Sequence, residues 1–343
     1  MKHYNFGSIE QYRNICKQIK MKAEYQGEDA DGNAIYNPNA PKPVLTFTGT
    51  VKLHGTNAAV VYSKEHGLYA QSRERVLSIE SDNAGFAFYV ESNREYFENQ
   101  LSKICEMYDY HVAVIYGEWA GGNIQKGVGI CNQEKSFYPF LLKYFNEKGE
   151  EIEHFLPAAP VNENEECWVH LPEKKMHVIT SFPTFTLDVD FNHPELVQNE
   201  LIRITEEVER ECPVAKHFGH SGIGEGVVWT ANWNGKQYRF KVKGEKHSSS
   251  KVKTLASVDT DKIESCQKFA EYAVTESRFE QALQAVFPDG NLDVKQIGAL
   301  LKWMNTDIIK EEMDTLVANN LEFKEVAKYI ADATKKRFFE CIL

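Results

Sequence analysis

Residues 226–243 read GVVWTANWNGKQYRFKVK and give the clearest structural signal in the chain. β-Branched and aromatic residues dominate 226–233 and 237–243, as expected of two strands. Asn234-Gly235 joins the two runs, and both residues tolerate the positive φ that a two-residue hairpin turn requires. The stretch therefore predicts an antiparallel hairpin, and strand alternation places Lys241 and Lys243 on one face of it.

Further strands are predicted upstream of this hairpin, each rich in apolar residues of strand-forming type. They are VLTFTGTV at 44–51, AAVVY at 58–62, VAVIYGEW at 112–119 and FLLKYF at 140–145. One helix is expected among them, from Asn83 to Met107, because apolar residues recur there at helical spacing. The polar residues 27–43, which include three prolines, are expected to form a loop ahead of the first strand.

The character of the chain changes after residue 258. From there on, apolar residues recur every three or four positions and no strand-like run interrupts them. A length of 343 residues suits about two domains. The sequence therefore predicts an α+β domain over residues 1–253, with antiparallel sheets and flanking helices, and a small all-helical domain over residues 254–343.

The composition is that of a soluble protein, with 42% hydrophobic and 26% charged residues. No apolar run approaches the roughly 18 residues that a membrane span needs, and the start carries no signal-peptide pattern. The seven cysteines show no metal-ligand or redox-motif spacing. We therefore expect a cytoplasmic protein with reduced thiols and no membrane partner.

The net charge of -11 is unusual for a protein that binds nucleic acid. The charge is unevenly distributed, however, because residues 236–253 hold seven basic residues and one acid, Glu245. The basic residues are Lys236, Arg239, Lys241, Lys243, Lys246, Lys251 and Lys253. A solvated surface run is the usual explanation of such a cluster, but a local nucleic-acid surface on an acidic protein has the same pattern.

The segment TVKLHGTN, residues 50–57, lies between two predicted strands and contains Lys52. Taken alone, it could be a polar turn with an exposed lysine. At a strand end facing a pocket, a lysine can instead be a covalent nucleophile. An amine attacks phosphorus only when it is unprotonated, a state that nearby positive charge or burial favours.

Four later segments contain residues that suit a phosphate-bearing ligand. Arg73 in QSRER could grip phosphate through its planar fork, and Glu118 ends an apolar strand, where a carboxylate can accept hydrogen bonds from a ribose. Phe140 in FYPF could stack on a purine. Glu225 in GEGVVW has a glycine on each side, and Lys241 and Lys243 follow it, two cations that could neutralise a leaving pyrophosphate.

In this order, the segments resemble the covalent nucleotidyltransferases, which include polynucleotide ligases and messenger-RNA capping enzymes. The shared signature is Lys-x-x-Gly, a strand-end glutamate, Glu-Gly and a closing Lys-x-Lys, and it covers about 190 residues of this chain. The forms KLHGTN, GEWAG and FYPF are most similar to the phage RNA ligase 2 family, which also contains the RNA-editing ligases of trypanosomes.

The resemblance implies an ATP-grasp-like nucleotidyltransferase domain, an ATP-dependent RNA ligase activity, and a role for each matching residue. Lys52 would carry AMP, His54 would assist the phosphate chemistry, and Glu225 would place Mg²⁺ or Mn²⁺. The residues implied in binding ATP are Phe6, Lys52, Leu53, Asn57, Arg73, Glu118, Phe140, Glu225, Lys241 and Lys243. Of these, Phe140 would stack on adenine, Glu118 would bind the ribose and Asn57 would sense the nick.

The expected reaction joins a 3′-hydroxyl to a 5′-phosphate in nicked or splinted RNA, first through a lysyl-AMP and then through an RNA-adenylate. We expect RNA as the partner, a monomer, and a location in the cytoplasm, that of the host if a phage encodes the chain. Two positions depart from the family pattern, Val51 and Leu141, where relatives often carry acids. The alternatives are a ligase of DNA or of RNA/DNA hybrids, and an inactive nucleic-acid-binding module.

Overall fold

The computed structural model describes residues 1–158, 167–244, 246, 260–287 and 290–342. The chain forms two compact units, one from Met1–Lys17 and Val44–Ala256, the other from Gln18–Pro43 and Ser257–Leu343. The domain boundary expected after residue 253 lies in 247–259, outside the described residues, and stays a prediction. Among the described helices, none is long and apolar enough to cross a membrane.

A four-stranded antiparallel sheet contains the hairpin predicted at residues 226–243. Its strands lie in the order β11-β10-β3-β9. The bounds are Val44–Lys52 for β3, Phe185–Asp190 for β9, Gly226–Trp233 for β10 and Lys236–Lys243 for β11. Asn234 and Gly235 form the turn with φ of 49° and 70°, which confirms the predicted hairpin.

Strand register divides this sheet into a polar and an apolar face. Lys52 of β3 lies opposite Gly226 of β10, which in turn lies opposite Lys243 of β11. The alternate residues Phe47, Trp229 and Phe240 are fully buried, and their rings pack together. Helix α4, Gln198–Arg210, contacts β10 and β11 and buries its own apolar residues at helical spacing. Helix α4 is not among the elements predicted above.

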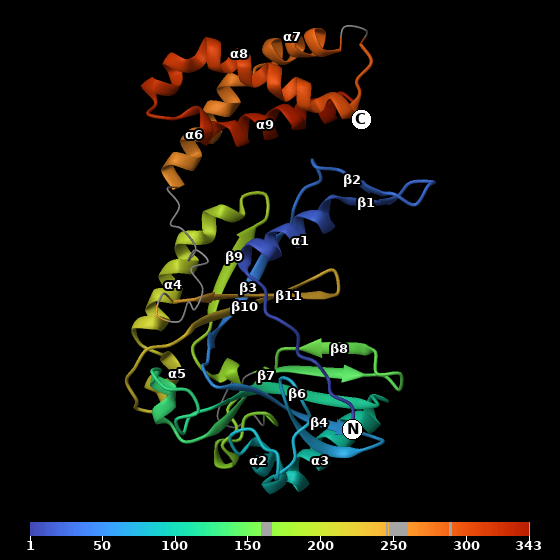
Figure 1. The fold of residues 1–343 in the computed structure, drawn as a ribbon, viewed down its shortest axis with the longest axis vertical. Coiled ribbons are helices and arrows are strands. Elements are labelled where there is room, and N and C mark those ends of the chain that lie inside the picture. The colour runs from blue at the N-terminus through green and yellow to red at the C-terminus, as the bar shows by residue number, and fades with distance from the viewer. Residues whose placement is uncertain (159–166, 245, 247–259, 288–289, 343) are drawn as a thin grey trace. The chain divides into compact units, whose positions relative to one another are not determined.

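A five-stranded antiparallel sheet has the order β5-β4-β6-β7-β8. Its strands are β4 at Thr56–Ser63, β5 at Gly67–Ser72, β6 at Val112–Ala120, β7 at Ser136–Phe145 and β8 at Glu151–Phe155. Helices α2, Phe86–Ser92, and α3, Arg94–Met107, cover one face (Figure 1). The prediction of one helix over this stretch is wrong, because Asn93 takes a non-helical φ of -114° and ψ of 20° between the two.

The N-terminal segment, residues 1–10, connects the two sheets of the first unit. At its start, the amide of Gln71 donates to the carbonyl oxygen of Tyr4 and accepts from its N–H, at 2.7 and 3.0 Å. Tyr4 and Phe6 pack into the apolar cluster on the face of the five-stranded sheet opposite α2 and α3. At its end, Glu10 forms a parallel bridge to Phe240 of β11.

The second unit contains a hairpin and a helical bundle. Strands β1, Tyr25–Glu28, and β2, Ala34–Tyr36, replace part of the loop predicted over 27–43. The carboxylate of Asp29 stabilises their turn by accepting from the N–H groups of Asp31 and Asn33. The helices are α1 at Tyr12–Glu24, which begins in the first unit, α6 at Thr260–Ala273, α7 at Glu276–Val286, α8 at Ile297–Ala318 and α9 at Phe323–Glu340.

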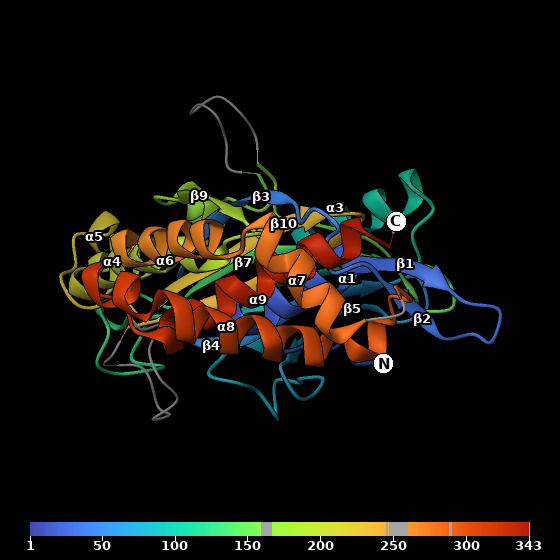
Figure 2. The same cartoon turned by 90° about the horizontal axis from the view of Figure 1, so that it is seen from above.

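The helices α6 to α9 bury a common apolar core, which confirms the helical character predicted for this region. They contact one another and lie side by side in both views (Figures 1 and 2). The fully buried residues of this apolar core include Leu300, Ile308, Ile330 and Phe338. Of the shorter elements, α5 is at Pro213–His217, and single 3₁₀ turns lie at Gly129–Asn132, Pro172–Lys174, Ile179–Ser181, Pro194–Val197 and Val294–Gln296.

Candidate active site

A cavity of about 400 Å³ opens between the two sheets of the first unit. This volume lies in the range of small-molecule sites. The cavity is lined by every residue that the sequence singled out for the ligand. These are Phe6, Lys52, Leu53, His54, Asn57, Arg73, Glu118, Phe140, Glu225, Lys241 and Lys243. Residues more than 200 positions apart in the chain therefore meet in one place.

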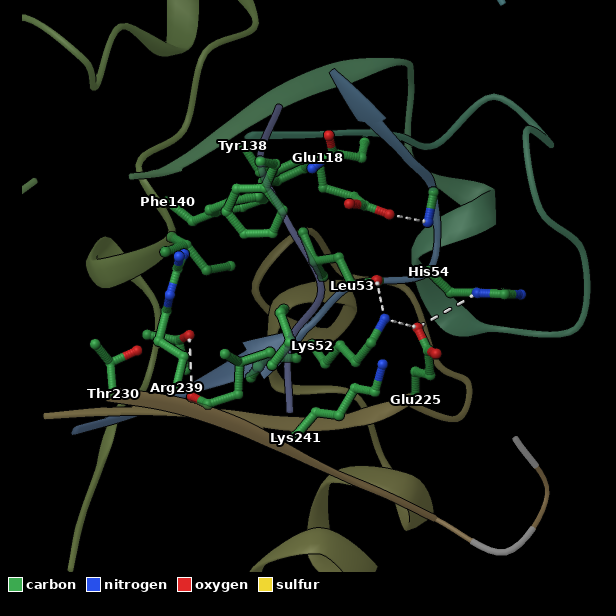
Figure 3. A pocket seen from close by; sticks show the side chains of 18 of the residues that line it. Lys52, Leu53, His54, Glu118, Tyr138, Phe140, Glu225, Thr230, Arg239 and Lys241 are labelled. Carbon is green, nitrogen blue, oxygen red and sulfur yellow. Dashed lines mark hydrogen bonds and ion pairs between the residues drawn. The ribbon is translucent and has the colours of Figure 1, made fainter. Parts of the chain in front are cut away.

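Lys52 ends β3 and points at a buried carboxylate (Figure 3). Its Nζ donates to Oε2 of Glu225 at 2.6 Å, and Nζ of Lys243 lies 2.7 Å from Oε1 of the same group. Nδ1 of His54 lies 3.4 Å from Oε2. Glu225 is only 2% exposed, so both of its oxygens are held by side chains of the site.

The sheet register creates this cluster. Gly226 lies between Lys52 and Lys243 in one row across three strands, and Glu225 immediately precedes it. A Cβ at Gly226 would lie 2.1 Å from the carbonyl oxygen of Val242, and the φ of Gly226 is +149°. Only glycine fits this position without strain. Gly226 therefore lets β11 approach closely enough for Lys243 to reach Glu225.

Positive charge dominates the cavity wall. Five cationic side chains line it, against the two carboxylates of Glu118 and Glu225. Burial lowers the pKa of Lys241 below its ordinary value, and the nearby charges of Lys243 and Lys52 lower it further. Burial alone would raise the pKa of Glu225, but the adjacent lysines more than compensate and lower it. The excess of cations suits a ligand with several negative charges.

Glu118 lies on β6, directly opposite Asn57 of β4. Its Oε1 accepts from the N–H of Gly55 at 2.9 Å, a contact that ties the carboxylate to the turn after Lys52. Burial raises the pKa of Glu118 to about 7, and the positive charge of Lys52 offsets only part of this effect. Near neutral pH the side chain is thus poised between its protonated and ionised forms.

An aromatic wall closes the opposite end of the cavity. The rings of Phe6 and Phe140 lie 5.1 Å apart, and Phe6 also contacts Tyr116. Phe140 is the extra residue of a β-bulge, because Tyr116 pairs with Leu141 whereas Gly117 pairs with Pro139. The bulge places Phe140 and Leu141 against the same apolar cluster, so that the departure at Leu141 is a fully buried core position.

Two further predicted positions differ in exposure. Arg73 follows β5 and lines the cavity with a side chain that is 58% exposed, and its Nε lies 3.6 Å from Glu74. Val51, the other departure, is 3% exposed and lies opposite Val227. Of the basic run at 236–253, Lys251 and Lys253 lie outside the described residues, and Lys236 and Lys246 are exposed.

Several residues of the cavity are not predicted by the sequence motifs. Arg239 was noted only as a member of the basic run, although the alternation that pairs Lys241 with Lys243 also places Arg239 on their face. Thr230 lies opposite Arg239 in the register, and Tyr138 precedes the bulge. Other unpredicted residues of the wall are Gly7, Ile9, Thr50, Leu156, Ile179 and Val228. Leu156 and Ile179 come from connecting segments and had no sequence signal.

The arrangement has the chemistry of a nucleotide pocket. A lysine amine, a cluster of cations and a buried carboxylate lie at one end, and an aromatic wall lies at the other. Among the described residues, no group of three or more histidine, cysteine, aspartate or glutamate side chains could hold a metal ion by itself. A divalent cation at Glu225 would therefore need further ligands from a phosphate or from water, as Mg²⁺ commonly has.

Comparison with known proteins gives one family. The RNA ligase family model matches residues 45–243, more than half of the chain. No individually curated protein is a match. Similar solved structures include a Naegleria gruberi RNA ligase with PPi, with 18% identity over 72% of this chain and 59% of that one and a TM-score of 0.41. A mutant of that ligase with ATP and Mn has 17% identity over 70% of this chain and 56% of that one, with a TM-score of 0.40. The chain thus spans less than two thirds of those proteins.

Proposed function

The chain belongs to the RNA ligase family, and from this premise we propose that it seals RNA ends with ATP, with Lys52 as the residue that carries AMP. The reaction would join a 3′-hydroxyl to a 5′-phosphate at a nick or splinted junction. The observation that carries the proposal is the row of Lys52, Gly226 and Lys243 across three strands. It brings the amines of both lysines to the carboxylate of Glu225, the residue before Gly226, inside one cavity.

In the first step, Nζ of Lys52 attacks the α-phosphorus of ATP. A nitrogen–phosphorus bond forms, the bond from that phosphorus to the bridging oxygen breaks, and pyrophosphate leaves with the electron pair. Nζ must lose its proton and leave the 2.6 Å ion pair with Glu225. Lys241 and Lys243 lie on the same sheet face and would neutralise the charge that develops on the phosphates.

Glu225 fits the role of a metal ligand once nucleotide is present. Its two oxygens bind lysines in this structure, and phosphate oxygens would compete for those lysines and release the carboxylate. Mg²⁺ or Mn²⁺ held there would act as a Lewis acid on the phosphate oxygens. A single carboxylate combined with substrate phosphates is a common coordination for Mg²⁺.

In the later steps the same pocket is used again. AMP passes from Lys52 to the RNA 5′-phosphate, and the 3′-hydroxyl then displaces AMP and forms the phosphodiester. Both steps are phosphoryl-type transfers, in which positioning and charge neutralisation give most of the catalysis. We assign His54, 3.4 Å from Glu225, to this phosphate chemistry, Arg73 to the ribose or the RNA 5′-phosphate, and Asn57 to the strand end at the nick.

At the aromatic end, Phe140 would stack on adenine and Glu118 would accept hydrogen bonds from the ribose. Phe6 and Leu53 would enclose the adenosine, because both line the cavity and both are almost fully buried. This assignment puts the base and the phosphates at opposite ends of the pocket, and the aromatic rings at one end and the lysines beside Glu225 at the other support it.

The decisive experiment is incubation with α-labelled ATP and Mg²⁺, followed by denaturation. The wild type should retain the label, and Lys52→Ala should retain none. Lys148→Ala, which removes an exposed lysine in a surface turn, is the matched control and should be labelled normally. The wild type is first treated with pyrophosphate to remove AMP acquired during expression. If it still takes no label, the ligase proposal fails and a binding module takes its place.

The strand preference needs a second experiment. Nicked duplexes of RNA, of DNA and of both hybrid types are compared at equal concentration, with the labelled enzyme as the AMP donor. We expect the fastest sealing when the 3′-hydroxyl strand at the nick is RNA. Equal or faster sealing of an all-DNA nick would refute the RNA preference but leave the lysyl-AMP chemistry intact.

A further inference from the structure

Arg239 occupies an unusual place in the cavity. It lies on β11 in the same face as Lys241 and Lys243, but four residues from Lys243, which is about 13 Å along a strand. Its guanidinium carbon lies 4.7 Å from the ring centroid of Phe6. In Figure 3 it is on the side of Thr230 and Phe140, away from the pair of Lys52 and Glu225.

The guanidinium has no protein acceptor in the described part of the chain. No hydrogen bond or ion pair joins Arg239 to another described residue, although its side chain is partly buried and lines the cavity. A buried charge without a hydrogen-bonding partner is costly. Stacking on Phe6 satisfies the face of the guanidinium but none of its five N–H donors. These donors are therefore free to meet a ligand.

We infer that Arg239 reads the nucleotide base, by donating a hydrogen bond to one ring nitrogen of the purine. This inference rests on the proposed function, because it places the α-phosphate at Lys52. A mononucleotide bound in that way brings its base, not its phosphate chain, to the end of the cavity where Arg239 lies. Arginine can only donate, so its partner must be an acceptor atom such as N1, N3 or N7.

The chemistry separates Arg239 from its neighbours on the same strand. Lys241 and Lys243 are point charges near Glu225 and suit phosphate oxygens. Arg239 has a planar fork whose orientation the Phe6 ring fixes at a distance of 4.7 Å. A preoriented donor loses little freedom when it binds, and it therefore contributes to affinity and to the choice of base rather than to the rate of phosphoryl transfer.

The test measures how variants of Arg239 respond to ATP analogues that each lack one ring nitrogen. The rate of AMP transfer to Lys52 is measured against nucleotide concentration for ATP and for its 1-deaza, 3-deaza and 7-deaza analogues, each of which lacks one ring acceptor. The proteins are the wild type, Arg239→Met and Arg239→Lys. The matched control is Lys236→Met, which removes a cation that lies over the ring of Tyr238 on the same strand but outside the cavity.

We expect Arg239→Met to raise the half-saturating ATP concentration about 10- to 100-fold, the value of a charge-assisted hydrogen bond, with little change in the maximal rate. One deaza analogue should show the same loss on the wild type and no further loss on Arg239→Met. Arg239→Lys should recover only part of the affinity, and the control should behave as wild type. Thermal unfolding of each variant identifies any loss caused by misfolding.

The inference is overturned if all three analogues lose affinity equally on the wild type and on Arg239→Met, since Arg239 then touches no ring nitrogen. A lower maximal rate at unchanged half-saturation also overturns it. Both results leave the proposed function standing, because they require a wild type that takes label from ATP. A wild type without label would instead refute the proposed function and this inference together.

Discussion

Replacing Glu118 with glutamine tests whether the cavity shifts the pKa of this carboxyl group out of its ordinary range. Burial raises the pKa of Glu118 from 4.5 to about 7. The folded protein therefore binds the proton more tightly than the unfolded chain does, and the associated stability is complete below pH 4.5. It is lost as the pH rises through 7, because folding must then keep an ionised carboxylate in the cavity.

The size of the effect follows from the shift. Each pKa unit corresponds to about 1.36 kcal/mol, which sets a ceiling of roughly 3 kcal/mol for the loss between pH 4.5 and 8. Because part of the side chain faces the open cavity, where water screens its charge, we expect about 2 kcal/mol. Glutamine keeps the shape and still accepts from the N–H of Gly55, but it does not ionise, so Glu118→Gln should lack this loss.

The assay is urea unfolding without nucleotide at pH 5, 6, 7 and 8, for wild type and variant. The free energy of unfolding of Glu118→Gln minus that of wild type should rise by about 2 kcal/mol across this range. Glu147→Gln, which removes an exposed carboxylate, is the control and should follow the wild type. A difference between Glu118→Gln and wild type that stays constant with pH would refute the reasoning, whatever its sign.

Three further results are expected. Gly226→Ala should destabilise the first unit by roughly 3 kcal/mol or more and lower AMP labelling at least 10-fold. The reason is that the added Cβ would lie 2.1 Å from the carbonyl oxygen of Val242. Labelling at the wild-type level would contradict this prediction. Arg278→Ala should lower the stability of the second unit by about 3 kcal/mol, because Arg278 lies 2.8 and 2.9 Å from Asp307 and Glu312. The measurement is hydrogen exchange in α7 and α8, which should become faster. Unchanged exchange would show that these ion pairs contribute little to stability. An unreactive ATP analogue at 100 times its Kd should stabilise the protein by about 2.7 kcal/mol in thermal unfolding, and the absence of a shift would argue against the pocket.

The strands of the pocket were predictable because their composition and turn chemistry are local. The Asn234-Gly235 turn fixes β10 against β11, and the alternation within β11 fixes which of its side chains face the cavity. The motif residues were singled out by their joint order along the chain and by the family resemblance, because each segment taken alone could be an ordinary turn or strand end. The same alternation would have identified Arg239, had it been followed two residues further back.

The remaining features depend on contacts that no local pattern reveals. β9 lies beside β3 although about 140 residues separate them, and only the folded sheet shows this pairing. The bulge at Phe140 changes which face its neighbours take, whereas strict alternation would have placed Leu141 on the opposite face from Phe140. Apolar residues continue at helical spacing through 83–107, so the pattern does not reveal the break at Asn93, where the backbone dihedral angles leave the helical region.

The N-terminal segment that connects the two sheets also has a consequence for protein synthesis. Phe6 leaves the ribosome about 230 residues before Arg239, its partner in the cavity wall. At about 5–20 residues per second, this gap lasts roughly 10–50 s. During that interval Phe6 lacks the guanidinium of Arg239 over its ring, and Glu10 lacks its bridge to Phe240 of β11. The nucleotide pocket is therefore among the last parts of the first unit to be completed, because Arg239, Lys241 and Lys243 of its wall are synthesised after the other strands.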